Sequence, residues 1–306
     1  MVAKHSIPTF SVVIPTYNRC NVILETVQAV LNQTFSSFEV VVVDNGSTDH
    51  TSDIIRSISD SRVRYLKLKG SGSPASPRNH GIVEARGEWI AFLDSDDYWF
   101  PEKLESVANV LEKEDCDLIS HFQEIRDTRT NKVIEVMGYS CDAAITYEAI
   151  LRSENCFATS SIAIRRQFIT NRNLHFNESV KYFAVEDYDL WLRVLANGGK
   201  AVFLNKTLGV NNVSEGHMGV PELVFKNMFE LLKDHAHNVQ KFTDQREDLE
   251  NELISALHMR QAVLKLRMGE VWASMAGLKN AIVLRPLSPM SYFFFRLRQR
   301  FGLDSH

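Results

Sequence analysis

The stretch that decides the fold is FEVVVVDNGSTD, residues 38–49. It opens with a predominantly apolar run that stops at Asp44, and polar residues follow. Continuous rather than alternating apolarity is typical of a strand that is buried on both faces, as in a parallel sheet. Thr48 and Asp49 can then cap a helix whose isoleucines recur over residues 54–58.

The same alternation continues on both sides of this stretch. Further strands are predicted at residues 11–14, 62–68 and 89–93, and further helices at residues 23–31, 77–86 and 101–111. Gly87 is expected to stop the second of these helices. Strand–helix alternation of this kind predicts an α/β fold with a doubly wound, mostly parallel sheet.

The rest of the chain is less regular and then becomes helical. Strands are expected at residues 117–121, 160–164 and 201–204, a helix at 187–197, and almost wholly helical structure from 221 to 285. We therefore expect two domains. Residues 1–215 form the sheet domain, and residues 216–306 form a helical C-terminal region with a basic, aromatic tail.

The composition is that of an ordinary globular protein. The 306 residues are 44% hydrophobic, and a net charge of −4 leaves no basic excess, so no nucleic-acid partner is expected. The four cysteines are scattered and form no CxxC pair, which indicates reduced thiols. Without an apolar leader or a run of the roughly 18 apolar residues that span a bilayer, a cytoplasmic location is expected.

Three polar segments follow predicted strands directly: PTYNR at residues 15–19, DNGSTD at 44–49 and DSDD at 94–97. The carboxyl ends of parallel strands share one edge of the sheet, and ligands bind in the crevice outside that edge. These segments carry more polar and acidic side chains than turns require. The sequence therefore predicts a ligand site at this edge.

The pair Asp94 and Asp96 suits a divalent cation. Mg²⁺ and Mn²⁺ prefer oxygen ligands, and a two-residue spacing in an extended segment can point both carboxylates into one crevice. The alternative is that this acidic turn only introduces the helix that follows Pro101. Asp97 is expected to have such a structural role.

Five motifs in this order resemble the family-2 glycosyltransferases, which have the GT-A fold: PTYNR, VVVDNGSTD, SPRNHGI, FLDSDDYWFPEKL and VEDYDLWLR. The resemblance covers about residues 10–215. It implies a nucleotide-sugar donor, a divalent metal, Mn²⁺ or Mg²⁺, and inversion at the anomeric carbon. It also implies a role for each matching residue.

The first motifs carry the nucleotide. By resemblance, Pro15, Thr16 and Tyr17 lie in the loop under the nucleotide base, and Arg19 closes that loop. Asp44 matches the aspartate that accepts a hydrogen bond from a uracil ring, which implies a UDP-sugar.

The next motifs carry the diphosphate and the sugar. Arg78 and Asn79 match the segment over the nucleotide and diphosphate. Asp94, with Ser95 beside it, matches the ribose or sugar side of the site, and Asp96 matches the metal ligand. His217 is an optional third metal contact.

The last motif carries the chemistry. Asp187 matches the general base, and Glu186 the residue that orients the acceptor or the base. Asp187 also begins an amphipathic helix, in which Trp191 can wall a pocket. The alternative is an ordinary carboxylate at a helix N-terminus, where the helix dipole lowers the pKa.

Two parts of the helical region are open to interpretation. The tail, residues 285–301, combines aromatics with arginines and contains no acid. Such a segment either makes peripheral contact with an anionic membrane, at the inner face of the cytoplasmic membrane, or packs on the protein's own core. His235 and His237 are two apart on a predicted helix and are expected to face solvent.

The predicted function is therefore inverting, metal-dependent glycosyl transfer to a hydroxyl of a glycan or lipid-linked acceptor. A nucleotidylyltransferase would show a glycine-rich, basic phosphate loop after the first strand, and PTYNR is not one. The alternative is a non-catalytic nucleotide-sugar-binding regulator. The Glu186–Asp187 pair argues against it.

Overall fold

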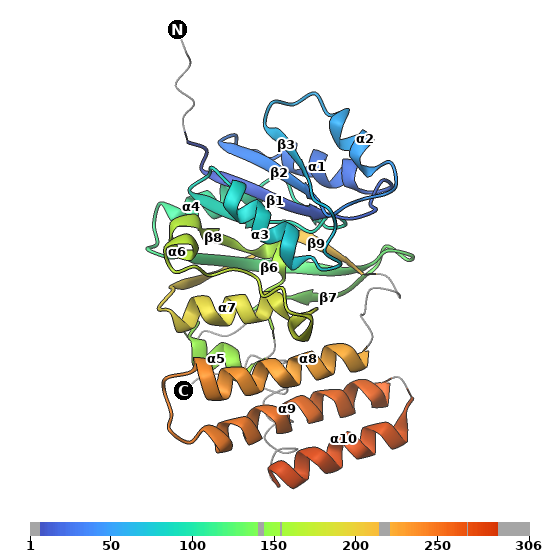
Figure 1. Ribbon diagram of the computed structural model, residues 1–306, viewed down its shortest axis with the longest axis vertical. Helices are drawn as coiled ribbons and strands as arrows, with labels where there is room; N and C mark the ends of the chain where they lie inside the picture. The colour runs from blue at the N-terminus through green and yellow to red at the C-terminus, as the bar shows by residue number, and fades with distance from the viewer. Residues whose placement is uncertain (1–6, 140–143, 154, 214–220, 268, 287–306) are drawn as a thin grey trace. The chain divides into compact units, whose positions relative to one another are not determined.

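The computed structural model describes residues 7–139, 144–153, 155–213, 221–267 and 269–286. The chain divides into two compact units (Figure 1). One consists of Met1–Tyr139, Asn155–Glu178 and Glu186–Met218, and the other of Ser140–Glu154, Ser179–Val185 and Gly219–His306. This differs from the expected division at residue 215, because two short stretches of the earlier chain belong to the helical unit.

The first unit is built on one sheet, whose strands in the described residues run in the order β3-β2-β1-β4-β8-β6-β9-β5, with β7 beside β6. The strands are β1 (Phe10–Thr16), β2 (Phe38–Asp44), β3 (Val63–Lys67), β4 (Trp89–Phe92), β5 (Tyr98–Trp99), β6 (Leu118–Asp127), β7 (Val133–Met137), β8 (Ala163–Arg165) and β9 (Ala201–Val213). Strands β3, β2, β1 and β4 pair in parallel, as do β6 and β9. The α/β prediction with its parallel core is confirmed.

Helices cover both faces of this sheet. They are α1 (Ile23–Leu31), α2 (Thr51–Arg56), α3 (Ala75–Glu84), α4 (Lys103–Leu111), α6 (Arg166–Asn171) and α7 (Glu186–Ala196). Val12 and Ile14 of β1 share a buried cluster with residues of α1, α2 and α4. Val13 points the other way, because side chains alternate along a strand, and there it meets α3.

Two glycines allow close approaches to β1. A Cβ at Gly81 would lie 2.2 Å from Val13 Cγ1, so only glycine lets α3 rest directly on the strand. Gly87 was expected to stop this helix, but α3 ends at Glu84 and Ala85 is already extended. Gly87 has a different task, because a Cβ there would lie 2.5 Å from the backbone nitrogen of Ser11.

Strands β6 and β9 are longer than the sequence indicated. They pair in parallel from Leu118 beside Ala201 to Asp127 beside Val213. The added part of β6 contains Gln123, Glu124 and Arg126, so its composition hid the strand. Backbone pairing with β9 extends it regardless of that polarity.

The second unit is helical. Its elements are α5 (Tyr147–Arg152), a 3₁₀ turn (Val180–Tyr182), α8 (Pro221–Asp234), a π-helical turn (His235–Val239), α9 (Arg246–Arg267) and α10 (Val271–Leu284). Buried leucines of α8 and α9 contribute to its core, among them Leu231, Leu249 and Leu253.

The prediction that His235 faces solvent was wrong. Its side chain is fully buried, and its Nδ1 lies 3.0 Å from the hydroxyl of Tyr147. His237 is half-buried, with its Nε2 2.6 Å from Glu250 Oε2. Both residues lie in the π-helical turn, where the α-helical spacing behind the prediction no longer holds.

Among the described residues, no helix is long and apolar enough to cross a bilayer. Two of the sequence predictions concern residues outside the described ranges. His217 lies outside the described residues, and so does the tail beyond Pro286.

Candidate active site

The ends of three strands bring the polar segments to one edge, as predicted. In the parallel register, Thr16 at the end of β1 lies beside Asp44 at the end of β2. Beyond β4, the Leu93 nitrogen donates to the Val13 carbonyl at 3.1 Å, so residues 94–97, which we call the acidic turn, follow at the same edge. Residues that are far apart in sequence therefore meet here because of the sheet topology alone.

The loops after β1 and β2 are cross-linked. The backbone nitrogen of Asn18, a residue with φ of 51°, donates to Ser47 Oγ at 3.0 Å. The Asn45 nitrogen donates to the Thr16 carbonyl at 2.8 Å. Tyr17 is left 53% exposed beside them, so its ring is available to a ligand. Pro15 lies within β1, one residue before its end, and is buried.

Asp44 is fully buried and holds two internal donors. Its Oδ1 accepts from the Ser47 nitrogen at 2.7 Å, and its Oδ2 accepts from the Tyr65 hydroxyl at 2.6 Å. Burial and this bond to Asp44 raise the pKa of Tyr65 to about 12. The sequence reasoning missed Tyr65. The signal was the parallel register, which sets Val42 beside Tyr65 and so places the tyrosine on the Asp44 side of the sheet.

The acidic turn presents two carboxylates and buries a third. The side chains of Asp94 and Asp96 are 30% and 27% exposed. Asp94 forms an ion pair with Arg78 at 2.7 Å, and Asp96 forms one with Arg19 at 3.3 Å. Burial raises the pKa of Asp97, whose carboxylate accepts from Ser160 Oγ at 2.5 Å, as its expected structural role requires.

Three residues that the sequence reasoning missed hold the backbone of this turn. Ser160 Oγ accepts from the Asp94 nitrogen at 3.0 Å, and Asn212 Nδ2 donates to the Asp96 carbonyl at 2.6 Å. Thr26 Oγ1 donates to the carbonyl of Ser95 at 3.0 Å. Ser160 and Asn212 come from the middle of the chain, where no motif marks them, so only the folded sheet reveals them.

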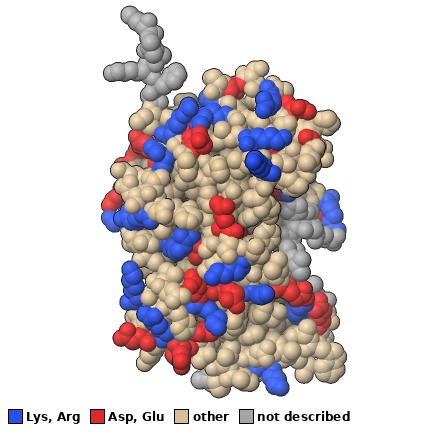
Figure 2. Space-filling view, in the orientation of Figure 1, with Lys and Arg blue, Asp and Glu red and all other residues tan. Residues whose placement is uncertain are grey.

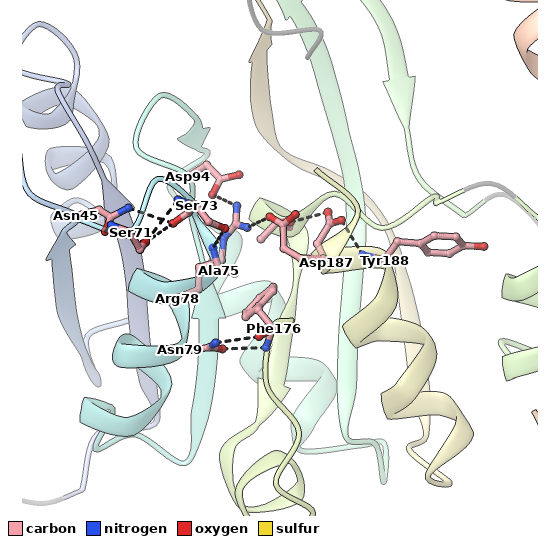
Figure 3. Close-up of polar contacts among 12 residues, drawn as sticks. Asn45, Ser71, Ser73, Ala75, Arg78, Asn79, Asp94, Phe176, Asp187 and Tyr188 are labelled. Carbon is pink, nitrogen blue, oxygen red and sulfur yellow. Dashed lines mark hydrogen bonds and ion pairs between the residues drawn. The ribbon is translucent and has the colours of Figure 1, made fainter. Parts of the chain in front are cut away.

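Arg78 joins this turn to the Glu186–Asp187 motif (Figure 3). Its Nη2 donates to Asp94 Oδ1 at 2.7 Å, and its Nη1 donates to Glu186 Oε1 at 2.9 Å. We call this pair of contacts the Arg78 bridge. Burial alone would lower the pKa of Arg78, but Asp94 and Glu186 together raise it. Arg78 is therefore a permanent cation between the two halves of the site.

Asp187 is held on both carboxylate oxygens. Its Oδ1 accepts from the Tyr188 nitrogen at 2.6 Å, and its Oδ2 accepts from Thr159 Oγ1 at 2.9 Å. Burial raises the pKa of Asp187, although Arg78 acts in the opposite direction. Burial likewise raises the pKa of Glu186. The raised pKa of Asp187 is opposite in direction to the lowering that the helix-dipole alternative implied, and desolvation is its largest cause.

Two residues of the motifs lie elsewhere than expected. Asn79 is turned away from the turn, because consecutive helix positions do not share a face, and its amide contacts both backbone groups of Phe176 (Figure 3). Trp191 does not wall a pocket. It is fully buried, with its ring centroid 5.7 Å from that of Phe176 and 6.0 Å from that of Phe92.

The acidic turn could supply some of the ligands of a divalent cation. Asp94 and Asp96 offer partly exposed carboxylate oxygens, which are suitable ligands. The described residues contain no group of three or more His, Cys, Asp or Glu side chains that could hold a metal ion. A cation here would therefore need further oxygens, such as those of a diphosphate or of water.

Residues 11–176, more than half of the chain, match the family described as Glycosyl transferase family 2. The chain is 35% identical over 192 residues to the UDP-Glc:alpha-D-GlcNAc-diphosphoundecaprenol beta-1,3-glucosyltransferase WfaP of Escherichia coli, which covers 62% of this chain and 72% of WfaP. It spans only 33% of another relative, an uncharacterized glycosyltransferase of Rickettsia bellii.

Solved structures share the fold. S. aureus TarS 1-349 in complex with UDP-GlcNAc matches with a TM-score of 0.67 and 24% identity, over 90% of this chain and 81% of that one. The mannosyltransferase PcManGT of Pyrobaculum calidifontis, in complex with GDP-Man and Mn²⁺, matches with a TM-score of 0.60 and 18% identity, over 96% and 81%. At these identities the likeness establishes the GT-A fold.

Proposed function

Because the chain belongs to glycosyl transferase family 2, we propose that it transfers a sugar from a UDP-sugar to a hydroxyl of a lipid-linked saccharide, with inversion and with a divalent cation. One observation carries this proposal. The Arg78 bridge ties the acidic turn to Glu186, a buried carboxylate next to the partly buried Asp187, and the pKa values of both are raised. A donor-binding turn and a general base in one network are what glycosyl transfer requires.

The donor would lie along the edge formed by β1, β2 and the acidic turn. The name of WfaP specifies UDP-Glc and the TarS complex contains UDP-GlcNAc, so a UDP-sugar is the natural candidate. Asp44 would accept from the uracil ring after the Tyr65 hydroxyl gives up its place on Oδ2. Tyr17, which is 53% exposed, would lie against the base.

Asp96 would hold the cation, with Asp94 beside it. When bound, a divalent cation neutralises charge on the diphosphate. The Mn²⁺ in the PcManGT complex supports this choice of group. Arg19 and Arg78 now neutralise these two carboxylates, so the site already balances its own charge. The Arg19 side chain is only 3.3 Å from Asp96 and would have to shift.

Asp187 would act as the general base. It takes the proton of the acceptor hydroxyl while the hydroxyl oxygen attacks the anomeric carbon. The bond from that carbon to the nucleoside diphosphate breaks, and its electron pair leaves with the diphosphate. One displacement from the opposite face inverts the configuration. A raised pKa suits this task, because a more basic carboxylate accepts the proton more readily.

The acceptor and the location follow from the relatives. The acceptor in the name of WfaP is linked to diphosphoundecaprenol, a lipid. We extend this to a lipid-linked saccharide as the acceptor here, although a soluble glycan is a second candidate. A cytoplasmic enzyme would meet such an acceptor at the inner face of the membrane. The aromatic and arginine-rich tail, residues 285–301, would give peripheral contact with anionic lipid there.

The alternative is a regulator that binds nucleotide-sugars without turnover. It gives no reason for a buried Glu186 beside a partly buried Asp187, both with raised pKa values. A panel of nucleotide-sugars with Mn²⁺ or Mg²⁺, assayed for release of nucleoside diphosphate, separates the two. Release that needs an acceptor supports transfer. Tight donor binding without release, for any acceptor, would support the regulator.

A further inference from the structure

The last described helix, α10, packs through its smallest side chains. Its buried residues are Gly277 and Ala281. A Cβ at Gly277 would lie 3.2 Å from both the Cβ of Ala262 and the carbonyl of His258, and Ser255 Oγ donates to the Ala281 carbonyl at 2.9 Å. These neighbours all belong to α9, so α10 rests against α9 by its glycine and alanine face.

The large apolar side chains of α10 point outward. They form a surface that we call the α10 face: Val271, Trp272, Met275, Leu278, Ile282 and Val283, all of them exposed. At 100° per residue, these positions share an arc of about 140°. Trp272 is 83% exposed and Val283 73% exposed. Lys279, the one charged residue within Val271–Leu284, falls in the same arc, and the surface over α10 is largely uncharged in Figure 2.

This arrangement is the reverse of an ordinary surface helix, which buries its large apolar residues and exposes polar ones. An exposed apolar surface rimmed by polar groups marks an interaction site. We infer that the α10 face is a docking surface for the lipid bilayer interface, with α10 lying flat along it. This rests on the proposed lipid-linked acceptor, since such an acceptor keeps the enzyme at a bilayer.

The chemistry of the α10 face suits that partner. A tryptophan prefers the boundary between the apolar and wet layers, because its ring is apolar and its N–H seeks a hydrogen bond. A lysine can extend its charged end to the headgroups while its methylenes stay in the apolar layer. Trp272 and Lys279 are therefore compatible with the interface, and the remaining side chains are aliphatic or methionine.

The chain that follows α10 favours a lipid over a protein partner. Residues 292–301, YFFFRLRQRF, combine bulky aromatics with arginines and contain no acid. An interfacial helix and a basic, aromatic segment that are adjacent in the chain supply two membrane signals, which stable peripheral attachment requires. The α10 face contributes apolar contact that salt does not weaken, while the arginines contribute attraction that salt screens.

Tryptophan fluorescence provides a site-specific test. Of the four tryptophans, Trp89, Trp99 and Trp191 are buried at 4%, 0% and 0% exposure, so only Trp272 changes environment when α10 docks. The 306-residue chain is mixed with phosphatidylcholine vesicles, and with vesicles that also contain phosphatidylglycerol, at low and high salt. A blue shift of the emission is expected with both, and part of it should persist at high salt.

Substitutions assign the shift to the α10 face. Trp272→Phe should remove the signal while the protein still sediments with vesicles. Val283→Glu should keep the reporter and weaken partitioning into phosphatidylcholine vesicles about tenfold. The matched control is Val83→Glu, because Val83 is 80% exposed but lies in α3, and it should change nothing. Far-UV circular dichroism checks that each variant folds.

Several results would overturn the inference. Sedimentation with vesicles while the Trp272 emission stays unchanged would leave attachment to the tail alone. A blue shift that grows with protein concentration and without vesicles would mean that a second copy covers the α10 face. An emission that is already blue at every concentration would mean that the chain covers it itself. UDP-sugar turnover on a soluble acceptor is measured separately, so failure here is distinguishable from failure of the proposed function.

Discussion

The contact between Asp44 and Tyr65 leads us to predict that removing a hydrogen bond will strengthen UDP binding. The tyrosine hydroxyl donates to Asp44 Oδ2 at 2.6 Å, on the carboxylate that we propose for uracil recognition. Tyr65→Phe removes this donor and leaves a buried carboxylate oxygen without it, which costs about 1–3 kcal/mol. A uracil N–H that takes the vacated position restores the lost bond. The variant should therefore bind UDP more tightly than the wild type does.

The size of the effect follows from that cost. A penalty of about 1–3 kcal/mol that UDP relieves corresponds to a gain in affinity of about 5- to 150-fold. The same penalty should lower the free energy of unfolding of the unliganded variant. Isothermal titration calorimetry with UDP and urea unfolding measure the two quantities. Asp44→Ala should act oppositely on binding and weaken it by about 1.5–3 kcal/mol.

A matched control is available in the second unit. The Tyr182 hydroxyl donates to Asp234 Oδ2 at 2.8 Å, and Tyr182→Phe removes a comparable bond there. That variant should lose stability without any gain in UDP affinity. If Tyr65→Phe binds UDP with unchanged or weaker affinity, then Tyr65 either stays in place or contacts the nucleotide itself, and the displacement is refuted.

Four further outcomes test the cation, the turn, the bridge and the base. Asp96→Ala should abolish transfer, as EDTA should, and full activity in EDTA would contradict a cation role. Asn212→Ala removes the hydrogen bond to the Asp96 carbonyl, so the Mn²⁺ concentration that gives half-maximal rate should rise about tenfold. Asn197→Ala, which removes a hydrogen bond to the Arg193 carbonyl, should leave that concentration unchanged. Arg78→Lys keeps the positive charge but cannot form both ion pairs, so the rate at saturating donor should fall at least about tenfold. An unchanged rate would show that the Arg78 bridge has no part in the mechanism. The rate should also decline as the pH falls through the raised pKa of Asp187, because a protonated carboxyl accepts no proton, and a flat acid limb would argue against this base.

Strand patterns and strand ends could be predicted from the sequence. The apolar run of β2 and its neighbours indicated a parallel sheet, and parallel strands must end at one edge. That topology was enough to place Asp44 and Asp94 together before any contact was known. These strands could be predicted from local sequence because they are short and buried, and polar residues mark their ends.

Features that depend on tertiary packing were not predictable. The direction of the Asp187 pKa shift is set by desolvation in the folded site, which outweighs the lowering by Arg78 and by the Thr159 hydrogen bond. The N-terminal helix position alone does not reveal this. The Asn79 side chain points to Phe176 and therefore away from the site, although the neighbouring Arg78 lies at the centre of the site. His235 became buried because a π-helical turn replaced the expected α-helical spacing.

The proposed general-base role of Asp187 can be tested with a single variant. Asp187→Asn preserves the shape of the side chain but gives up the charge that accepts the proton. General-base removal typically costs about 10²- to 10⁴-fold in rate. Asp187 is held by Thr159 and the Tyr188 nitrogen rather than by the acidic turn, so donor affinity should change little.

The measurement is turnover and UDP-sugar affinity of Asp187→Asn beside the wild type, with the anomeric configuration of the wild-type product read by NMR. We predict intact donor binding, a rate lower by at least about 100-fold, and inversion. A rate close to that of the wild type, or a product with retained configuration, would contradict it.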